Sequence, residues 1–573
     1  MPTQPVQNQP SFNDVFAAQR ATLNAAQLAA VKHIEGPTLV IAGPGTGKTH
    51  ILATRIGEIL TKTDAQAHNI LCLTFTDAAV RAMRERLTSL IGAEAHKVRI
   101  HTFHSFCNRV IQDHLDLFGR QDLTALDELE RRQLVRTLLD ELPFDHPLKK
   151  GRGSDVYFYE NHLADLFKLM KTEAWTTPSV SRAIDEWLEN LPNNVDFQYK
   201  ITKKGLFSKG DLKTDAVEDE TEKMARLRSA AQLYMAYEGK KSLLNRYDFD
   251  DMILWVIEAF ERMPFLLRGY QEQILYFMVD EFQDTNGAQN QLLTQLVGFW
   301  EQPNVFIVGD DDQAIYEFQG ARLKSLVDFY ESYRSDVEVV VLKDNYRSSQ
   351  NLLDSARKVI ENNELRIVNN LQGLQLDKNL MARGQSAALD NLPKVVEYPN
   401  RLQELADVVL QIEDLINFKH PNVGEVSNLA DVSDVSKSEK PSIAIIYARH
   451  RTAEAYIRLF EKRGIPYSVR RAINVLDEPL IQNLRTLLEY ISAENKMPFS
   501  GEYLLFKILN FSFLDIAPKD VLRFSMAFNA VIYAKNAAYT EGSFLELKIK
   551  NEELKTANDS ENTQNTEGSS LEL

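Results

Sequence analysis

Cysteine is scarce in this chain of 573 residues, which contains only Cys72 and Cys107. Two thiols cannot build a disulfide framework, an iron–sulfur cluster or a four-thiolate zinc site. His101, His104 and Cys107 have the spacing of three metal ligands, but the sequence offers no fourth ligand nearby. We therefore expect no structural metal there, and a reducing cytoplasm as the location of the protein.

Long apolar runs are also missing. No stretch approaches the ~20 residues that a membrane helix needs, so we expect no membrane partner. The N-terminal sequence MPTQPVQNQPSFND is polar and proline-rich, without the basic and apolar regions of a signal peptide. We expect residues 1–15 and the polar residues 550–573 to be disordered.

Positive charge is not in excess either. The formal net charge is −16 at pH 7, and the sequence pI is about 5.3. This is not the basic composition typical of a protein that coats nucleic acid. An acidic chain can still bind DNA through a local groove, so the charge balance does not exclude a DNA partner.

Short apolar runs alternate with helical patterns in two parts of the chain. The runs typical of buried parallel strands are Leu39–Ala42, Ile70–Phe75, Ile274–Val279 and Val305–Val308. The helical patterns are His50–Leu60, Ala78–Ile91 and Gly287–Phe299. This alternation predicts an α/β fold with a parallel sheet, helices on both faces and a ligand at the carboxyl ends of the strands.

The pattern changes between Asp113 and Arg246, where the chain is charged, helical and without strand runs. We expect this segment to be a helical domain inserted into the α/β fold. Strands and helices resume at Val337, and SIAIIY at Ser442–Tyr447 predicts a further strand. The polar segment 420–441 before it predicts a flexible loop.

The stretch VIAGPGTGKT between a strand and a helix predicts a phosphate-binding loop. Gly47, Lys48 and Thr49 fit the Gly-x4-Gly-Lys-Ser/Thr pattern, with Ala42 in place of the first glycine. Glycine at alternate positions leaves room for backbone N–H groups around phosphate oxygens. Lys48 would neutralise the β- and γ-phosphates, and Thr49 would hold Mg²⁺.

A phosphate-binding loop also needs a second carboxylate for Mg²⁺ and a group that activates water. The stretch ILYFMVDEFQD delivers Asp280 and Glu281 at the end of an apolar strand. Asp280 is the natural Mg²⁺ partner, and Glu281 is the natural base. The two halves occur in the order typical of a nucleotide triphosphatase.

Eight stretches then identify the kind of triphosphatase. In chain order they are LNAAQ, AGPGTGKT, LTFTDAAVRAMRERL, IHTFHSFC, YDFDDMI, VDEFQDTNGAQ, VGDDDQAIYEFQGA and LKDNYRSS. Together they closely resemble the superfamily 1 DNA helicases of the UvrD/Rep/PcrA type. The resemblance is dense over residues 20–115 and 245–350 and looser over 440–490.

The resemblance implies ATP and Mg²⁺ as cofactors and a set of nucleotide contacts. Gln27 would bind adenine, Tyr346 would stack near it, and Gln313 and Arg347 would contact the γ-phosphate from the two motor domains. The implied catalytic residues are Glu281, Asp280, Lys48, Gln313 and Arg347. The implied nucleotide-binding residues are Gln27, Gly43, Pro44, Gly45, Thr46, Gly47, Lys48, Thr49 and Tyr346, with Thr49 and Asp280 as Mg²⁺ ligands.

The resemblance also implies contacts with single-stranded DNA and with single-strand/duplex junctions. The residues concerned are Thr74, Phe75, Thr76, Thr102, Phe103, His104, Tyr316 and Phe318. Aromatic stacking tolerates any base and contributes ~1–3 kcal/mol per base, which suits a motor that moves over any sequence. Taken singly, Phe75 and Phe103 would more often be core residues, and only the motif context favours a DNA contact.

The domain organisation implied by the resemblance is a RecA-like motor domain at 16–115 and 246–345, interrupted by an inserted helical domain at 116–245. A partial second RecA-like domain would follow at 346–490, with the start of a helical insertion at 491–549. Gln319 stands where the family usually has an arginine, and His50 replaces a frequent basic residue. The later family motifs do not appear, so we expect a fragment or one half of a split protein.

We therefore expect an ATP-dependent DNA helicase or translocase that moves 3′ to 5′ on single-stranded DNA in repair or recombination. Two alternatives stay open. One is an ATP- and DNA-binding fragment or split subunit that turns over only when a second chain supplies the missing motifs. The other is the helicase part of an AddA/RecB-like helicase–nuclease. A repair or recombination protein is a further expected partner.

Overall fold

The computed structural model describes residues 12–527, apart from 120–121, 150–154, 204–205, 316–323, 365, 371–373, 375, 390–391, 418–441, 470–474 and 499. Residues 1–11, the loop expected at 420–441 and the tail at 550–573 lie outside the described residues. Residues 12–15, expected to be disordered, instead begin the helix α1 (Phe12–Ala21). The chain divides into two compact units, and the division falls between Val395 and Val396.

A parallel sheet forms the centre of the first unit. Its strands are β1 (Thr38–Ala42), β2 (Ile70–Thr74), β3 (Arg99–Thr102), β6 (Tyr276–Val279), β7 (Val305–Gly309) and β8 (Glu338–Leu342). They form one six-stranded sheet in the order β3-β2-β6-β7-β1-β8, and all the neighbouring strands run parallel. The predicted α/β fold is confirmed, and the loops after the strands meet at one end of the sheet.

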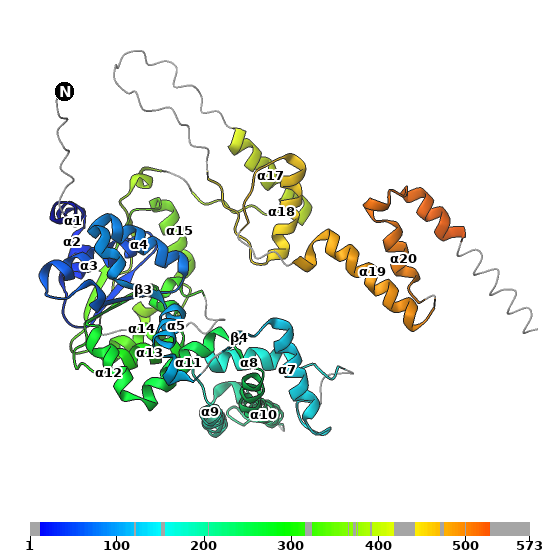
Figure 1. Ribbon diagram of the computed structural model, residues 1–573, viewed down its shortest axis with the longest axis horizontal. Coiled ribbons are helices and arrows are strands. Elements are labelled where there is room, and N and C mark those ends of the chain that lie inside the picture. The colour runs from blue at the N-terminus through cyan, green and yellow to red at the C-terminus, as the bar shows by residue number, and fades with distance from the viewer. Residues whose placement is uncertain are drawn as a thin grey trace, which may run out of the picture. The chain divides into compact units, whose positions relative to one another are not determined.

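Helices cover both faces of this sheet, because successive strand side chains point to opposite faces. Val40 and Ala42 of β1 pack in one core cluster, whereas Leu39 and Ile41 pack in the other. The first face carries α2 (Ala25–Lys32), α3 (Lys48–Lys62) and α4 (Asp77–Ile91); the second carries α5 (Phe103–Asp113), α11 (Phe249–Arg262), α12 (Pro264–Gln273), α13 (Gly287–Val297) and α14 (Lys324–Ser332). Figure 1 shows α3 and α4 in blue and α11 to α13 in green.

Local sequence fixes where the helices that follow the strands begin. Thr76 caps α4 by accepting from the N–H of Ala79, and Thr102 caps α5 together with Ser105. Asn286 caps α13 in the same way. Each cap satisfies backbone N–H groups that have no partner within the helix. The loops after the strands are therefore held by their own side chains.

A helical segment is inserted between α5 and α11, as the charged sequence predicts. It contains α7 (Glu128–Glu141), α8 (Glu160–Thr172), α9 (Thr177–Asn190) and the long α10 (Thr214–Leu243). Its core is formed by apolar side chains of α7, α8 and α10. Two short strands, β4 (Thr124–Ala125) and β5 (Arg246–Tyr247), pair in parallel where the segment leaves and rejoins the sheet domain.

The chain after β8 stays with the first unit up to residue 395. It contains β9 (Asp344–Asn345), α15 (Gln350–Ile360), α16 (Ile367–Asn370) and β10 (Met381–Ala382), and β9 pairs with β10. The domain boundaries expected from the sequence stay predictions.

The second unit is helical in the part of the chain that is described. α17 (Arg401–Asn417) packs against α18 (His450–Arg463) through Val409, Tyr456 and Phe460. α19 (Pro479–Lys496) and α20 (Glu502–Leu509) pack against each other farther along the chain.

The strand predicted at Ser442–Tyr447 was wrong, because these residues have no strand assignment. A strand needs neighbours for its backbone groups, and no strand is assigned among the described residues of the second unit. Ile445 packs on the cluster of α17 and α18, whereas Ile446 is 95% exposed. The inward–outward alternation of side chains predicted by the sequence is present. A neighbouring strand that would pair with the backbone of these residues is not found among the described residues.

Candidate nucleotide and DNA sites

The loop between β1 and α3 has the backbone shape of a phosphate cradle. Gly45 and Gly47 have φ values of +69° and +89°, a left-handed conformation that other residues rarely adopt. A Cβ at Gly45 would come within 2.7 Å of a neighbouring side chain. Thr46 Oγ1 donates to the carbonyl of Gly43 at 2.7 Å, and α3 begins at Lys48. The N-terminal N–H groups of a helix favour an anion at this place.

Lys48 and Glu281 face each other across this cradle. The distance between Lys48 Nζ and Glu281 Oε2 is 2.5 Å. Glu281 lies just beyond β6 and has φ +50°, which is uncommon for a residue with a side chain and clusters at functional sites. The predicted cation and the predicted base are thus neighbours.

Asp280 precedes Glu281 and is buried, with 7% of its surface exposed. Burial and the neighbouring Glu281 carboxylate raise the pKa of Asp280 to about 7, against a lowering effect of Lys48. A buried carboxylate whose negative charge is only partly offset by Lys48 is suited to binding a divalent cation. The same two causes raise the pKa of Asp284 to about 6, and Asp284 Oδ1 has no hydrogen-bond partner among the described residues. These carboxyl groups, with Thr49 in the first turn of α3, fit a Mg²⁺ ion.

Gln283 connects this carboxylate pair with the loop after β7. Its Nε2 donates to Glu281 Oε2 at 2.9 Å, and its Oε1 accepts from the N–H of Asp310 at 2.9 Å. Only 1% of Gln283 is exposed. Gln313 Nε2, in turn, donates to Asp310 Oδ2 at 2.5 Å. A continuous chain of hydrogen bonds therefore runs from Lys48 to the predicted γ-phosphate sensor.

Three consecutive aspartates follow β7 and are neutralised from a later segment. Lys378 Nζ lies 2.9 Å from Asp310 Oδ1 and 2.9 Å from Asp312 Oδ2, and it also contacts Asp311. Arg366 binds both oxygens of Asp312, at 2.7 and 2.8 Å. These cations are provided by the chain beyond β8, so the loop that carries Gln313 is fixed from outside the sheet.

The residues after β8 form a second wall along the cradle. The N–H of Tyr346 donates to the carbonyl of Gly45 at 2.9 Å, and Asn345 Nδ2 donates to the carbonyl of Pro44 at 2.5 Å. Asn345 Oδ1 accepts from the N–H of Arg347 at 2.9 Å. Arg347 is exposed, and its Cβ would lie 2.7 Å from a Cβ at Gly45, so it lies beside the cradle. Its contact with a γ-phosphate stays a prediction.

The predicted adenine site lies at the other end of the cradle. Gln27 is buried, its Nε2 donates to the carbonyl of Thr46 at 2.8 Å, and its Oε1 accepts from the N–H of Asn24 at 3.0 Å. Asn24 Nδ2 also donates to the hydroxyl of Tyr346 at 3.1 Å, and the Tyr346 ring is partly exposed. The structure brings these predicted residues together, with the amide of Gln27 already engaged by the protein.

The two predicted DNA loops follow β2 and β3 at the carboxyl end of the sheet. Thr76 is exposed and Phe75 is partly exposed. Thr74 is buried, and Phe103, with 2% exposed, packs in the core. His104 lies 3.3 Å from a carboxylate oxygen of Asp250.

Not every predicted DNA contact lies equally near the surface. Thr102 is 9% exposed and caps α5, and Phe103 supports its loop from within the core. Tyr316 and Phe318, together with Gln319, lie outside the described residues. The DNA contacts stay predictions.

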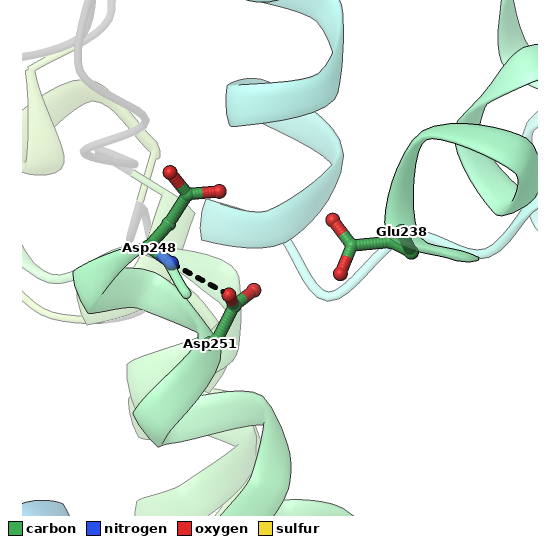
Figure 2. Close-up of side chains that lie close together, drawn as sticks. All are labelled: Glu238, Asp248 and Asp251. Carbon is green, nitrogen blue, oxygen red and sulfur yellow. Dashed lines mark hydrogen bonds between the residues drawn. The ribbon is translucent and has the colours of Figure 1, made fainter. Parts of the chain in front are cut away.

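A second acidic cluster lies where the inserted helices rejoin the sheet domain. Glu238, Asp248 and Asp251 have carboxylate oxygens within 4.8 Å of one another, and Figure 2 shows them converging from α10 and the start of α11. Lys171 Nζ lies 2.7 Å from Glu238 and 2.8 Å from Asp251, and Lys241 Nζ lies 2.5 Å from Asp251. The two ammonium groups occupy the cluster, which is therefore a buried ion-pair network rather than a metal site.

Sequence reasoning missed Gln283, Lys378 and Arg366. Gln283 lies inside the quoted stretch VDEFQD, so its position two residues after Glu281 was the available signal. Lys378 and Arg366 carry no such signal, because they are distant in sequence from the aspartates that they contact.

No helix in the described part of the chain is both long and apolar enough to cross a membrane. Comparison with protein families matches residues 23–334 to the UvrD/REP helicase N-terminal domain, and residues 340–558 to the UvrD-like helicase C-terminal domain. The second match continues well beyond β8, so it does not support the expectation of a truncated second half.

Curated relatives include ATP-dependent DNA helicase PcrA of Staphylococcus aureus, strain Mu50. It is 28% identical over 476 residues, which are 82% of this chain and 54% of the relative. The protein of the same name from Staphylococcus epidermidis, strain RP62A, is 27% identical over 500 residues, 87% of this chain and 57% of the relative. The chain thus spans somewhat more than half the length of these relatives.

Proposed function

Because this chain belongs to the UvrD/REP helicase family, we propose that it is an ATP-dependent DNA helicase or translocase that moves 3′ to 5′ on single-stranded DNA. A cytoplasmic location and a role in DNA repair or recombination are parts of the same proposal. The observation that supports it best is the hydrogen-bonded chain from Lys48 through Glu281 and Gln283 to Asp310 and Gln313.

ATP would lie along the cradle with its phosphates at the N-terminus of α3. Lys48 would bind the β- and γ-phosphates, and Gln27 and Tyr346 would contact the base. Thr49 and Asp280 would hold Mg²⁺, which neutralises phosphate charge. Arg347 would stabilise charge on the transferring phosphoryl group from the second wall.

Hydrolysis needs one proton acceptor, and the carboxylate of Glu281, which lies beside Lys48, would be that acceptor. A water molecule attacks the γ-phosphorus, its proton passes to the Glu281 carboxylate, and the bond from the γ-phosphorus to the β,γ-bridging oxygen breaks. The phosphates compete with Glu281 for Lys48, so nucleotide binding would release the carboxylate for this role. Through its two hydrogen bonds, Gln283 would hold the Glu281 carboxylate in a fixed position relative to the loop that carries Gln313.

DNA would bind across the loops after β2 and β3, which lie at the same end of the sheet as the nucleotide. Phe75 and Thr76 are the accessible members of these loops. Because both ligands would bind at the carboxyl ends of neighbouring strands, a change in one loop could alter the other. This proximity supports a motor that couples hydrolysis to movement on DNA.

Steady-state ATP hydrolysis by the full chain, with and without single-stranded oligodeoxythymidylate, tests the proposal. We expect turnover that rises with DNA and is lost in Lys48→Ala. A chain that binds neither nucleotide nor DNA would refute it. Strand displacement from duplexes with a 3′ or a 5′ tail tests the polarity, and displacement from the 5′-tailed duplex alone would overturn it.

A further inference from the structure

A groove runs beside β3, the edge strand of the sheet. Its volume is about 570 Å³, and it is lined by β3, the segment before it, α4, α5 and α12. No residue predicted to bind nucleotide or DNA lines it. The groove is therefore separate from the sites described above.

Basic side chains dominate this groove, although the whole chain carries a net charge of −16. Arg84, Lys97, Arg99 and Arg109 line it, against a single carboxylate, Asp113. Lys97 pairs with Glu94, and Arg109 pairs with Asp113, but these pairs are exposed. Exposed ion pairs contribute little to stability, so these side chains can leave their partners readily.

Arg84 and Arg99 are not neutralised by such pairs. Arg84 donates to the carbonyls of Ala95 and Ile100, at 3.2 and 3.4 Å, and Arg99 donates to Gln273 Oε1 at 3.0 Å. No carboxylate lies within ion-pair distance of either guanidinium among the described residues. Two charged groups are thus held in place by neutral acceptors.

His101 reports the resulting positive field. Its pKa is lowered by burial and then by the charges of Arg84, Arg99 and Arg109. Burial has the larger effect on this pKa, and the three guanidinium charges that add to it indicate a local field that favours an anion.

The groove lies next to the predicted DNA loops. β3 runs from Arg99, at the groove, to Thr102, at the loop, a span of about 10 Å at ~3.3 Å per residue. Since β3 is the edge strand, a strand of DNA that crossed the loops after β2 and β3 and continued past the sheet would pass this groove. Phe265 on α12 lines it with 66% of its surface exposed, which offers an aromatic face for a base.

The same geometry disfavours a peptide that would extend the sheet. Such a peptide needs the free backbone groups of the edge strand, and Arg84 already donates to the carbonyl of Ile100 in β3. An edge with one carbonyl already engaged and with arginines around it suits phosphate oxygens better than a peptide backbone.

We propose that this groove binds the phosphate backbone of the single-stranded DNA that leaves the loops after β2 and β3, through Arg84, Lys97, Arg99 and Arg109, with Phe265 as a stacking platform. This inference rests on the proposed function and extends the DNA track beyond the family motifs that predict it. The groove lengthens the bound segment without taking part in ATP hydrolysis.

Fluorescence anisotropy with oligodeoxythymidylates of about 8 and about 16 nucleotides tests the proposal, because single-strand sites range over ~4–16 nucleotides. Lys97→Gln/Arg109→Gln changes only exposed side chains, so folding is retained. We expect it to weaken binding of the longer oligonucleotide about tenfold and to lower its salt slope by about 1.4, at ~0.7 per lost phosphate contact. Phe265→Ala should also weaken binding of the longer oligonucleotide. ATP turnover at saturating DNA should be unchanged in both variants.

Lys32→Gln/Arg334→Gln is the matched control. Lys32 lies on α2, which packs beside β8, and Arg334 precedes β8; both are exposed. Since β8 is the edge strand opposite β3, removing these two charges should leave binding unchanged. Equal affinities and salt slopes for wild type and the groove variant would overturn the inference while leaving the proposed function intact. It would also be overturned if an oligoglutamate peptide bound the wild type and lost affinity in the groove variant, with DNA binding unaffected. A wild type that binds neither oligonucleotide refutes the proposed function as well.

Discussion

Lys48 of the phosphate cradle and Glu281 at the end of β6 form an ion pair, with 2.5 Å between Nζ and Oε2. The cation predicted to hold the phosphates thus neutralises the carboxylate predicted to activate water. Nucleotide phosphates would compete for the same ammonium group, which links nucleotide binding to the release of the base. The predictions below begin with the two members of this pair.

Lys48→Ala should abolish tight nucleotide binding, because it removes a charged hydrogen-bond donor whose loss costs ~1.5–3 kcal/mol. Titration with a fluorescent ATP analogue measures this as an increase of the Kd by one to two orders of magnitude or more. Lys32→Ala, an exposed lysine on α2, is the control. Equal Kd values for the two variants would remove Lys48 from the site.

Glu281→Gln should keep nucleotide binding and slow hydrolysis, since an amide accepts no proton from the attacking water. A positioned base contributes ~10²–10⁴-fold, so we expect a loss of that order in single-turnover hydrolysis. Glu272→Gln, on the exposed surface of α12, should behave as the wild type. Turnover that survives in Glu281→Gln in the presence of DNA would assign the base to another residue.

Gln283→Glu should lower kcat about tenfold while the KM for ATP changes little, because Gln283 positions Glu281 and touches no substrate. Its Nε2 donor would be replaced by a carboxylate that repels Glu281. Protonation at low pH restores a donor, so the ratio of variant to wild-type activity should rise as the pH falls. Gln283→Leu should show the loss without this pH dependence, and a pH-independent ratio for both variants would contradict the positioning role.

Lys378→Met should destabilise the protein by about 3–5 kcal/mol, because it leaves buried aspartates without their cation. The control is Lys343→Met, whose ion pair with Asp377 is exposed and should contribute only ~0–1 kcal/mol. Urea unfolding measures both. Similar losses in the two variants would show that the aspartates after β7 do not depend on Lys378.

Asp280→Asn should stabilise the folded chain at pH 8 in the absence of Mg²⁺. Burial raises the pKa of Asp280 from 3.8 to about 7, so the folded state holds this proton more tightly than the unfolded chain. The free energy of unfolding therefore falls as the pH rises through this interval, and the loss is complete above it. Urea unfolding should show that Asp280→Asn raises the free energy of unfolding by about 1–3 kcal/mol at pH 8, and that this gain shrinks toward pH 4. An equal gain at both pH values would contradict the burial of a charged carboxylate as its cause.

The sequence by itself determined the sheet domain and the local structure of the loop between β1 and α3. Three kinds of local feature were sufficient: apolar runs long enough for one strand, glycines where φ is positive, and caps such as Thr76 and Thr102. The structure of each is determined by a few neighbouring residues. The cradle, the Asp280–Glu281 pair and the helices around the sheet could be predicted for this reason. The Ser442–Tyr447 strand could not, because a strand also needs neighbours that its own residues do not specify.

Only the tertiary structure decided which distant groups meet. The pairing of Lys378 with three aspartates, the bridge made by Gln283 and the basic groove beside β3 join segments from separate parts of the chain. Charge summed over the sequence is −16, and this sum hides a local excess of arginine that arises only when β3, α4 and α5 pack together. Electrostatic interactions depend on distance in space, which composition and sequence spacing do not measure.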